Sequence, residues 1–183
     1  MDEAKTLPQA LRNITAQQPD RVAMRMKEYG IWHDITWAEY LEQVKYVALG
    51  LYALGVRRGD HVAIIGENKP EWLYSAMGIM SLGATFVGVY TTNPAEECEY
   101  VVGHSESVVF FCEDEEQFDK ALVFRKRTPA LKKVVVWDME GLKHYDDPIL
   151  MSFDALLELG KKTAEEKPWR QCGRQKRAAI HSW

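Results

Sequence analysis

The sequence TWAEYLEQVKYVALGLYALGVRRGDHVAII, residues 36–65, predicts a long amphipathic helix followed by a buried strand. Thr36 and Glu39 have the spacing of a capping box, in which each side chain accepts a hydrogen bond from the backbone N–H of the other residue. The apolar side chains that follow recur at helical spacing, and Gly55 stands where a glycine in the left-handed conformation ends a helix. The apolar run His61–Ile65 then predicts a strand that is buried on both faces.

The residues before this stretch predict a capped helix and a hairpin. Thr6 can cap a helix whose apolar residues share one face, and Pro19 marks the end of that helix. Strands over 21–26 and 31–35 flank the turn Glu28-Tyr29-Gly30, which contains the glycine that such turns favour. The N-terminal segment is therefore predicted to contain a helix and a hairpin ahead of the long helix.

After residue 65 the sequence alternates helices with short apolar strands. Pro70 suits the first turn of a helix that runs to Ser81. Further strands are predicted over 85–90, 108–112 and 134–137, and further helices over 94–102, 114–126 and 152–161. Such alternation produces parallel strands joined by right-handed crossover helices that cover both faces. The predicted fold class is therefore α/β, a layered, mostly parallel sheet flanked by helices.

One uncharged segment, residues 72–95, is long enough to cross a bilayer. Gly78, Gly83 and Gly88 interrupt it, and its β-branched residues are concentrated after Gly83. This composition favours a helix followed by a buried strand over a transmembrane span. The N-terminus shows no basic stretch leading into an apolar one, so no secretory signal is visible and a cytoplasmic location is expected.

The overall composition is that of a soluble globular protein, with 46% hydrophobic and 27% charged residues in 183. The charge is uneven, because residues 161–183 carry a net +5 and residues 1–160 a net −9. We therefore predict one α/β domain over residues 1–162 and a basic tail over 163–183 that is disordered and contributes little to stability. The basic residues of the tail follow no regular face or motif, so nucleic-acid binding is not expected.

Two turns are the places where an open parallel sheet would bind a ligand, since ligands lie beyond the carboxyl ends of the strands. They are residues 66–69 and 90–93. Lys69 precedes a helix N-terminus and could help to hold an anion, but a solvated lysine in a strand-to-helix turn is the favoured interpretation. The acidic run 113–116 is explained by the favourable interaction of carboxylates with a helix dipole, rather than by a metal site.

The sequence assigns no catalytic, cofactor-binding or metal-binding residue. Its histidines have no i, i+4 pairing, and Cys98, Cys112 and Cys172 are widely spaced, as expected of reduced thiols. Neither of the phosphate-cradling motifs G-x-x-x-x-G-K-[ST] and G-x-G-x-x-G occurs in it.

Four stretches of the sequence carry a family resemblance. ITWAEY at 35–40 and LYALGVRRGDHVAI at 51–64 resemble, in order and spacing, the opening of the adenylate-forming synthetase superfamily. GENKPEW at 66–72 and MSLGATFVGVYTTN at 80–93 resemble the long-chain fatty acyl-CoA synthetase branch, including the bubblegum-like enzymes. The resemblance covers residues 6–162 and is strongest between residues 36 and 93.

The resemblance implies the N-terminal α/β part of an AMP-forming enzyme. Such an enzyme uses ATP to convert a fatty acid to an acyl-adenylate and then transfers the acyl group to CoA, while Mg²⁺ offsets charge on the phosphates. The family's Ser/Thr/Gly-rich phosphate loop with its trailing Pro-Lys has no counterpart here. Its downstream aromatic, Thr-Glu, ribose-binding Asp and catalytic Lys motifs are also absent.

The expected function is therefore that of a truncated N-terminal fragment of a long-chain fatty acid–CoA ligase, inactive alone. The complete enzyme would bind fatty acid, ATP and CoA, and none of ATP, Mg²⁺ and CoA is expected to bind productively to this chain. No transmembrane segment and no nucleic-acid partner are expected. Peripheral membrane contact and self-association through the truncated face both fit this interpretation.

Two other functions stay open at this point. A non-catalytic interaction module derived from such an enzyme would need a partner that covers the truncated edge. An unrelated α/β nucleotide-binding domain would need a phosphate-binding turn, and none is readable in the sequence.

Overall fold

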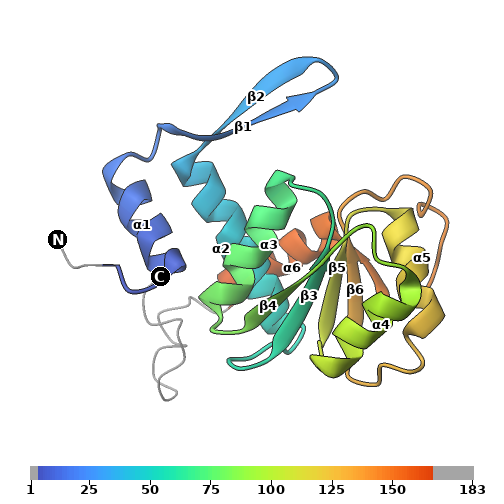
Figure 1. Ribbon diagram of the computed structural model, residues 1–183. Helices are drawn as coiled ribbons and strands as arrows, with labels where there is room; N and C mark the ends of the chain where they lie inside the picture. The colour runs from blue at the N-terminus through green and yellow to red at the C-terminus, as the bar shows by residue number, and fades with distance from the viewer. Residues whose placement is uncertain (1–3, 167–183) are drawn as a thin grey trace.

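The computed structural model describes residues 4–166, which form a parallel sheet, helices on both of its faces and a separate hairpin (Figure 1). In chain order the elements are α1 (Leu7–Gln17), β1 (Val22–Glu28), β2 (Ile31–Thr36), α2 (Trp37–Ala53), β3 (His61–Ile65), α3 (Pro70–Ser81), β4 (Thr85–Val89), α4 (Ala95–His104), β5 (Val109–Cys112), α5 (Glu115–Phe124), β6 (Lys133–Val136), β7 (Leu150–Ser152) and α6 (Phe153–Glu166). The predicted α/β class with a parallel sheet is confirmed.

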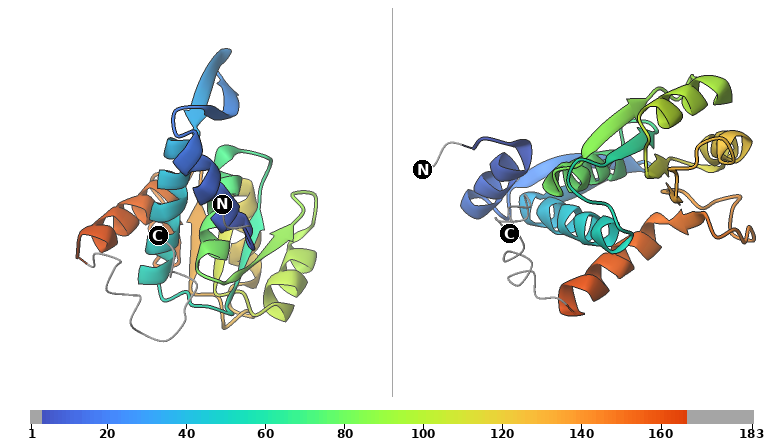
Figure 2. Two further views of the ribbon diagram at one scale, coloured as in Figure 1. Left: turned by 90° about the vertical axis from the view of Figure 1, so that its left-hand side faces the viewer. Right: turned by 90° about the horizontal axis from the view of Figure 1, so that it is seen from below.

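The main sheet has the strand order β4-β3-β5-β6-β7, and every neighbouring pair is parallel. From β3 the chain moves to one side, to β4, and then crosses back over β3 to β5 and continues to β6 and β7. Right-handed crossovers that run in opposite directions along a sheet place their helices on opposite faces. Accordingly α3 lies on the face that α2 and α6 cover, and α4 and α5 lie on the other face (Figure 2).

Side chains alternate along the strands between two separate cores. In β3, Val62 and Ile64 belong to the core beneath α2, α3 and α6, whereas Ala63 and Ile65 belong to the core beneath α4 and α5. Strand β5 repeats the pattern, and its residues are all buried. Burial on both faces explains why these strands are continuous apolar runs without polar alternation.

Three glycines let the helices of the first core pack closely. A Cβ atom on Gly50 of α2 would lie 2.5 Å from the Leu156 carbonyl oxygen of α6. A Cβ on Gly160 of α6 would collide with the Tyr46 carbonyl oxygen of α2, and one on Gly78 of α3 would lie 2.6 Å from Val47 Cγ1 of α2. Each distance is shorter than a van der Waals contact, so only glycine allows α2 to approach both neighbouring helices at this separation.

We predict that Gly160→Ala lowers the free energy of unfolding by about 1–3 kcal/mol, because the added methyl group meets backbone that cannot rotate away. The matched control is Gly103→Ala in α4, where the new Cβ would lie 3.6 Å from Thr128 Cγ2, an ordinary contact. That control should be neutral or should gain up to about 1 kcal/mol from helix propensity. Urea unfolding monitored by circular dichroism measures both, and equal midpoints for the two variants would contradict the close packing.

The predicted signals at both ends of α2 are confirmed. The Thr36 N–H donates to Glu39 Oε2 at 2.7 Å, and the Glu39 N–H donates to Thr36 Oγ1 at 3.2 Å. The bond from the Thr36 N–H, together with one from the Thr36 hydroxyl to the same carboxylate oxygen at 2.8 Å, lowers the pKa of Glu39. Gly55 has a φ of 95°, in the left-handed region that was predicted for the helix end.

Several boundaries differ from the prediction. Strand β7 was not predicted, because three residues at the edge of a sheet are too few to show a period. Helix α6 continues to Glu166, so the predicted domain boundary at residue 162 falls inside a helix, and residues 163–166 of the predicted tail are helical. The rest of that tail, residues 167–183, lies outside the described residues.

The uncharged segment 72–95 forms most of α3, all of β4 and the turns around them, as predicted. No helix among residues 4–166 combines the length and the apolar character that a membrane crossing requires.

Candidate functional site

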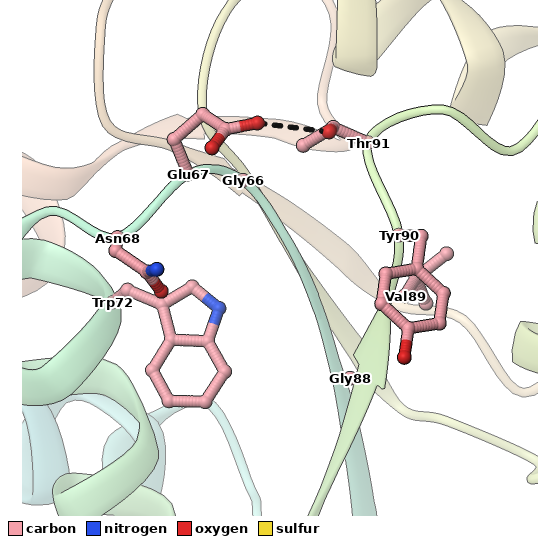
Figure 3. Close-up of a pocket in the computed structure, with 8 residues that line it drawn as sticks. All are labelled: Gly66, Glu67, Asn68, Trp72, Gly88, Val89, Tyr90 and Thr91. Atoms are coloured by element: carbon pink, nitrogen blue, oxygen red, sulfur yellow. Dashed lines mark hydrogen bonds between the residues drawn. The ribbon is translucent and has the colours of Figure 1, made fainter.

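A pocket of about 380 Å³ opens where strands β3 and β4 end. The two turns singled out from the sequence meet in it, which confirms that they share one edge of the sheet (Figure 3). The lining residues are Gly66, Glu67, Asn68, Trp72, Gly88, Val89, Tyr90 and Thr91. Parallel strands bring these segments together because their carboxyl ends point to the same side.

A hydrogen bond between two side chains closes one end of the pocket. Thr91 Oγ1 donates to Glu67 Oε1 at 2.9 Å, which joins the turn after β4 to the turn after β3 (Figure 3). The Thr91 carbonyl oxygen in turn accepts a hydrogen bond from Lys120 Nζ of α5 at 2.8 Å. The turn after β3 and helix α5 therefore both hold the Thr91 turn in place.

Beside the pocket, Glu113 ties the turn after β5 to the turn after β3. Its Oε1 lies 2.7 Å from Lys69 Nζ, and its Oε2 accepts a hydrogen bond from the Glu67 N–H at 2.6 Å. The Glu113 side chain is only 12% exposed, so this ion pair is partly shielded from water. The hydrogen bond to Glu113 raises the pKa of Lys69 above its ordinary value of 10.5.

This ion pair lies at the point where the strand order reverses. From β3 the connection leads outward to β4, and from β5 it leads the opposite way to β6, so the crevice between the ends of β3 and β5 is the usual ligand-binding position of such a sheet. Glu113 and Lys69 come from the turns on the two sides of that crevice. Their ion pair therefore spans that position.

The structure corrects two interpretations of the sequence. Lys69 is not merely a solvated lysine, since it is paired with Glu113. The acidic run does begin a helix, with Asp114 as the N-cap whose side chain accepts from the Gln117 N–H at 3.1 Å. Glu113, however, precedes that cap, so its carboxylate serves the turn after β3 rather than the helix dipole.

The polar side chains of this site bind the turns of the protein itself, and few of them are available to a reacting group. Both nearby lysine ammonium groups donate to protein oxygens, Lys69 to Glu113 and Lys120 to Thr91. Burial raises the pKa of the Cys98 thiol and raises that of the Cys112 thiol further, so neither is a thiolate at neutral pH. Within residues 4–166 there is no cluster of three or more His, Cys, Asp or Glu side chains suited to hold a metal ion.

The family of AMP-binding enzymes matches residues 11–170 of this sequence, which is most of the chain. The chain belongs to that family. The resemblance to adenylate-forming synthetases inferred from the four sequence stretches is thereby confirmed.

Curated relatives of this AMP-binding family protein are ligases by name. The long-chain-fatty-acid–CoA ligase ACSBG2 of Xenopus laevis is 33% identical over 156 residues, which cover 85% of this chain and 21% of that protein. The ligase FadD15 of Mycobacterium tuberculosis is 36% identical over 117 residues, covering 64% of this chain and 20% of that protein. The chain thus spans about a fifth of the length of the curated relatives it matches.

Solved structures of adenylate-forming enzymes share the fold of this AMP-binding family chain. The anthranilate CoA ligase AuaEII, crystallised with anthranoyl-AMP, superposes with a TM-score of 0.74 at 22% identity, over 86% of this chain and 29% of that chain. The A-PCP didomain of carboxylic acid reductase from Segniliparus rugosus, in complex with AMP, has a TM-score of 0.72 at 17% identity, over 88% of this chain and 27% of that chain. At these identities the likeness establishes the fold.

We predict that Glu113→Gln lowers the free energy of unfolding by about 1–2 kcal/mol at neutral pH, because the amide cannot accept a charged hydrogen bond from Lys69 and one from the Glu67 N–H together. Since the pKa of Lys69 is raised, the advantage of the wild type should be complete between neutral pH and pH 10.5 and fall as pH rises through the raised pKa.

The control for this substitution is Glu116→Gln, whose side chain is 76% exposed and should change stability by less than about 0.5 kcal/mol. Urea midpoints at several pH values measure both variants. A Glu113→Gln protein that unfolds at the wild-type midpoint would show that the pair does not hold the turns.

Proposed function

We propose that this chain forms the N-terminal α/β scaffold of a long-chain fatty acid–CoA ligase and does not catalyse that reaction alone. The observation that carries the proposal is the ion pair between Lys69 and Glu113 at the ends of β3 and β5. The AMP-binding family fold is present, and Lys69 and Glu113 pair across the position between β3 and β5 where open parallel sheets generally bind ligands. The curated relatives named as long-chain-fatty-acid–CoA ligases support the choice of reaction.

The described residues do not fit ATP or Mg²⁺ as a reaction centre. A nucleotide triphosphate needs cations or backbone N–H groups aimed at its phosphates, and here Lys69 and Lys120 are already bound to protein oxygens. The carboxylates Glu67 and Glu113 would also repel a phosphate that approached the turns after β3 and β5. We therefore assign no catalytic, cofactor-binding or metal-binding role to any of residues 4–166.

In this proposal the described residues hold the turns at the sheet edge in fixed positions. The hydrogen bonds of Glu67, Thr91 and Glu113 fix the turns after β3, β4 and β5 relative to one another. A rigid sheet edge of this kind can support ligand-contacting segments supplied by other parts of an enzyme. The complete ligase would use ATP, Mg²⁺, a fatty acid and CoA.

The other functions considered from the sequence have unequal support. An unrelated nucleotide-binding domain conflicts with membership of the AMP-binding family. A non-catalytic interaction module stays a prediction, because it depends on a partner chain.

We predict that the 183-residue chain releases no pyrophosphate in the presence of palmitate, ATP, Mg²⁺ and CoA above the level without protein. Aligning the carboxylate with the α-phosphate is worth about 7–11 kcal/mol in such reactions, and the scaffold alone does not provide that alignment. The Xenopus laevis ligase, assayed in parallel, is the positive control. Palmitate-dependent pyrophosphate release by the chain alone would contradict the proposal.

A further inference from the structure

The tip of the β1–β2 hairpin carries a group of exposed apolar side chains. Tyr29 is 97% exposed, Trp32 is 63% exposed and Ile31 is 62% exposed. The hairpin is a two-stranded sheet of its own, and its tip stands away from the main sheet and its helices in Figure 1 and in the left view of Figure 2. Apolar side chains gathered at a protruding point mark a contact site more often than a folding requirement.

The backbone conformation of the turn favours a role for Tyr29 in contact with another molecule over a role in folding. Both central residues have positive φ, 46° for Tyr29 and 82° for Gly30, as a type I′ hairpin turn requires. Asparagine, aspartate and glycine adopt this conformation with little strain, whereas a tyrosine in it is uncommon and costs stability. Folding therefore favours another residue at position 29, and the tyrosine ring lies at the most exposed point of the tip.

Two contacts on one face stiffen the hairpin behind its tip. Arg25 Nε lies 2.8 Å from Asp34 Oδ1, and Lys27 Nζ lies 5.7 Å from the centroid of the Trp32 ring. These cross-strand pairs hold the indole and the ammonium group together near the end of the hairpin. Tryptophan, tyrosine and lysine are the residues that settle at a membrane–water interface, since each joins an apolar body to a polar group.

The size of the tip favours a lipid surface over a protein partner. Even if Tyr29, Ile31 and Trp32 were wholly buried, at most about 250 Å² each would be covered. Their sum does not reach the roughly 800 Å² that each partner contributes to a stable protein interface. A narrow convex tip can instead be surrounded by lipid headgroups on all sides. The charges of Arg25 and Lys27 are balanced by Glu28 and Asp34, so no strongly anionic lipid is required.

We propose that the hairpin tip, residues 27–32, is a membrane-contact surface that places the side chains of Tyr29, Ile31 and Trp32 in the interface of a phospholipid bilayer. This inference goes beyond the ligase proposal and does not depend on it. It assigns contact with the surface and no crossing of the bilayer.

The test is co-sedimentation of the full chain with sucrose-loaded phosphatidylcholine vesicles. Net-neutral lipid is used because the basic residues between 161 and 183 would respond to anionic lipid. We expect the wild-type chain to sediment with the vesicles and Tyr29→Asn to lower the partition coefficient about 3- to 10-fold. The same substitution should leave the urea midpoint unchanged or raise it, because asparagine suits the left-handed turn. Adding Trp32→Ser should lower partitioning further.

The matched control is Tyr100→Asn in α4, which removes a tyrosine that is 69% exposed elsewhere on the protein and should leave partitioning unchanged. A wild-type chain that stays in the supernatant at about 1 mM lipid would overturn the proposal. So would a Tyr29→Asn chain that partitions like wild type. Sedimentation velocity without vesicles supplies the remaining outcome, since a dimer that Tyr29→Asn dissolves would assign the tip to a second copy of the chain and also overturn it.

Discussion

The close approach of α2 and α6 is the contact on which the rest of the structure depends. Helix α2 precedes the first strand of the main sheet and α6 follows the last, so their packing joins the beginning and the end of the part of the chain that contains the main sheet. Gly50 and Gly160 make the approach close enough for each helix to contact the backbone of the other. Helix α3 packs through Gly78 onto the same helix α2. Helices α2, α3 and α6 together cover one face of the sheet.

With that face fixed, the reversal of strand order determines where a ligand crevice would form, between the ends of β3 and β5. In this protein Glu113 and Lys69 meet across it, and Glu67 and Thr91 continue the network to β4. These contacts hold the turns after β3, β4 and β5 relative to one another. Under the proposed scaffold function, membership of the AMP-binding family is compatible with the pairing of Lys69 and Lys120 with protein oxygens, because a scaffold contributes position and leaves the chemistry to other segments.

The alternation of strands and helices could be predicted from the sequence because burial on both faces leaves continuous apolar runs. The capping box at Thr36 and the left-handed Gly55 were also predictable, since both are local signals. Gly50 and Gly160 were not, because a glycine inside a helix indicates only a loss of helix propensity until the opposing backbone is known. The Glu113–Lys69 pair was missed for a related reason: it joins turns that are distant in sequence, and only the strand register brings them together.

Hydrogen exchange of the native 183-residue chain, followed by mass spectrometry, tests most directly whether the α2–α6 contact unites the fold. We predict that amides of α2, α6, β3 and β5 exchange with the same protection, through opening of the whole domain. The β1–β2 hairpin should exchange earlier, since it is a two-stranded sheet separate from the main sheet. Exchange of α6 that is faster than that of β3 and independent of it would contradict the central claim.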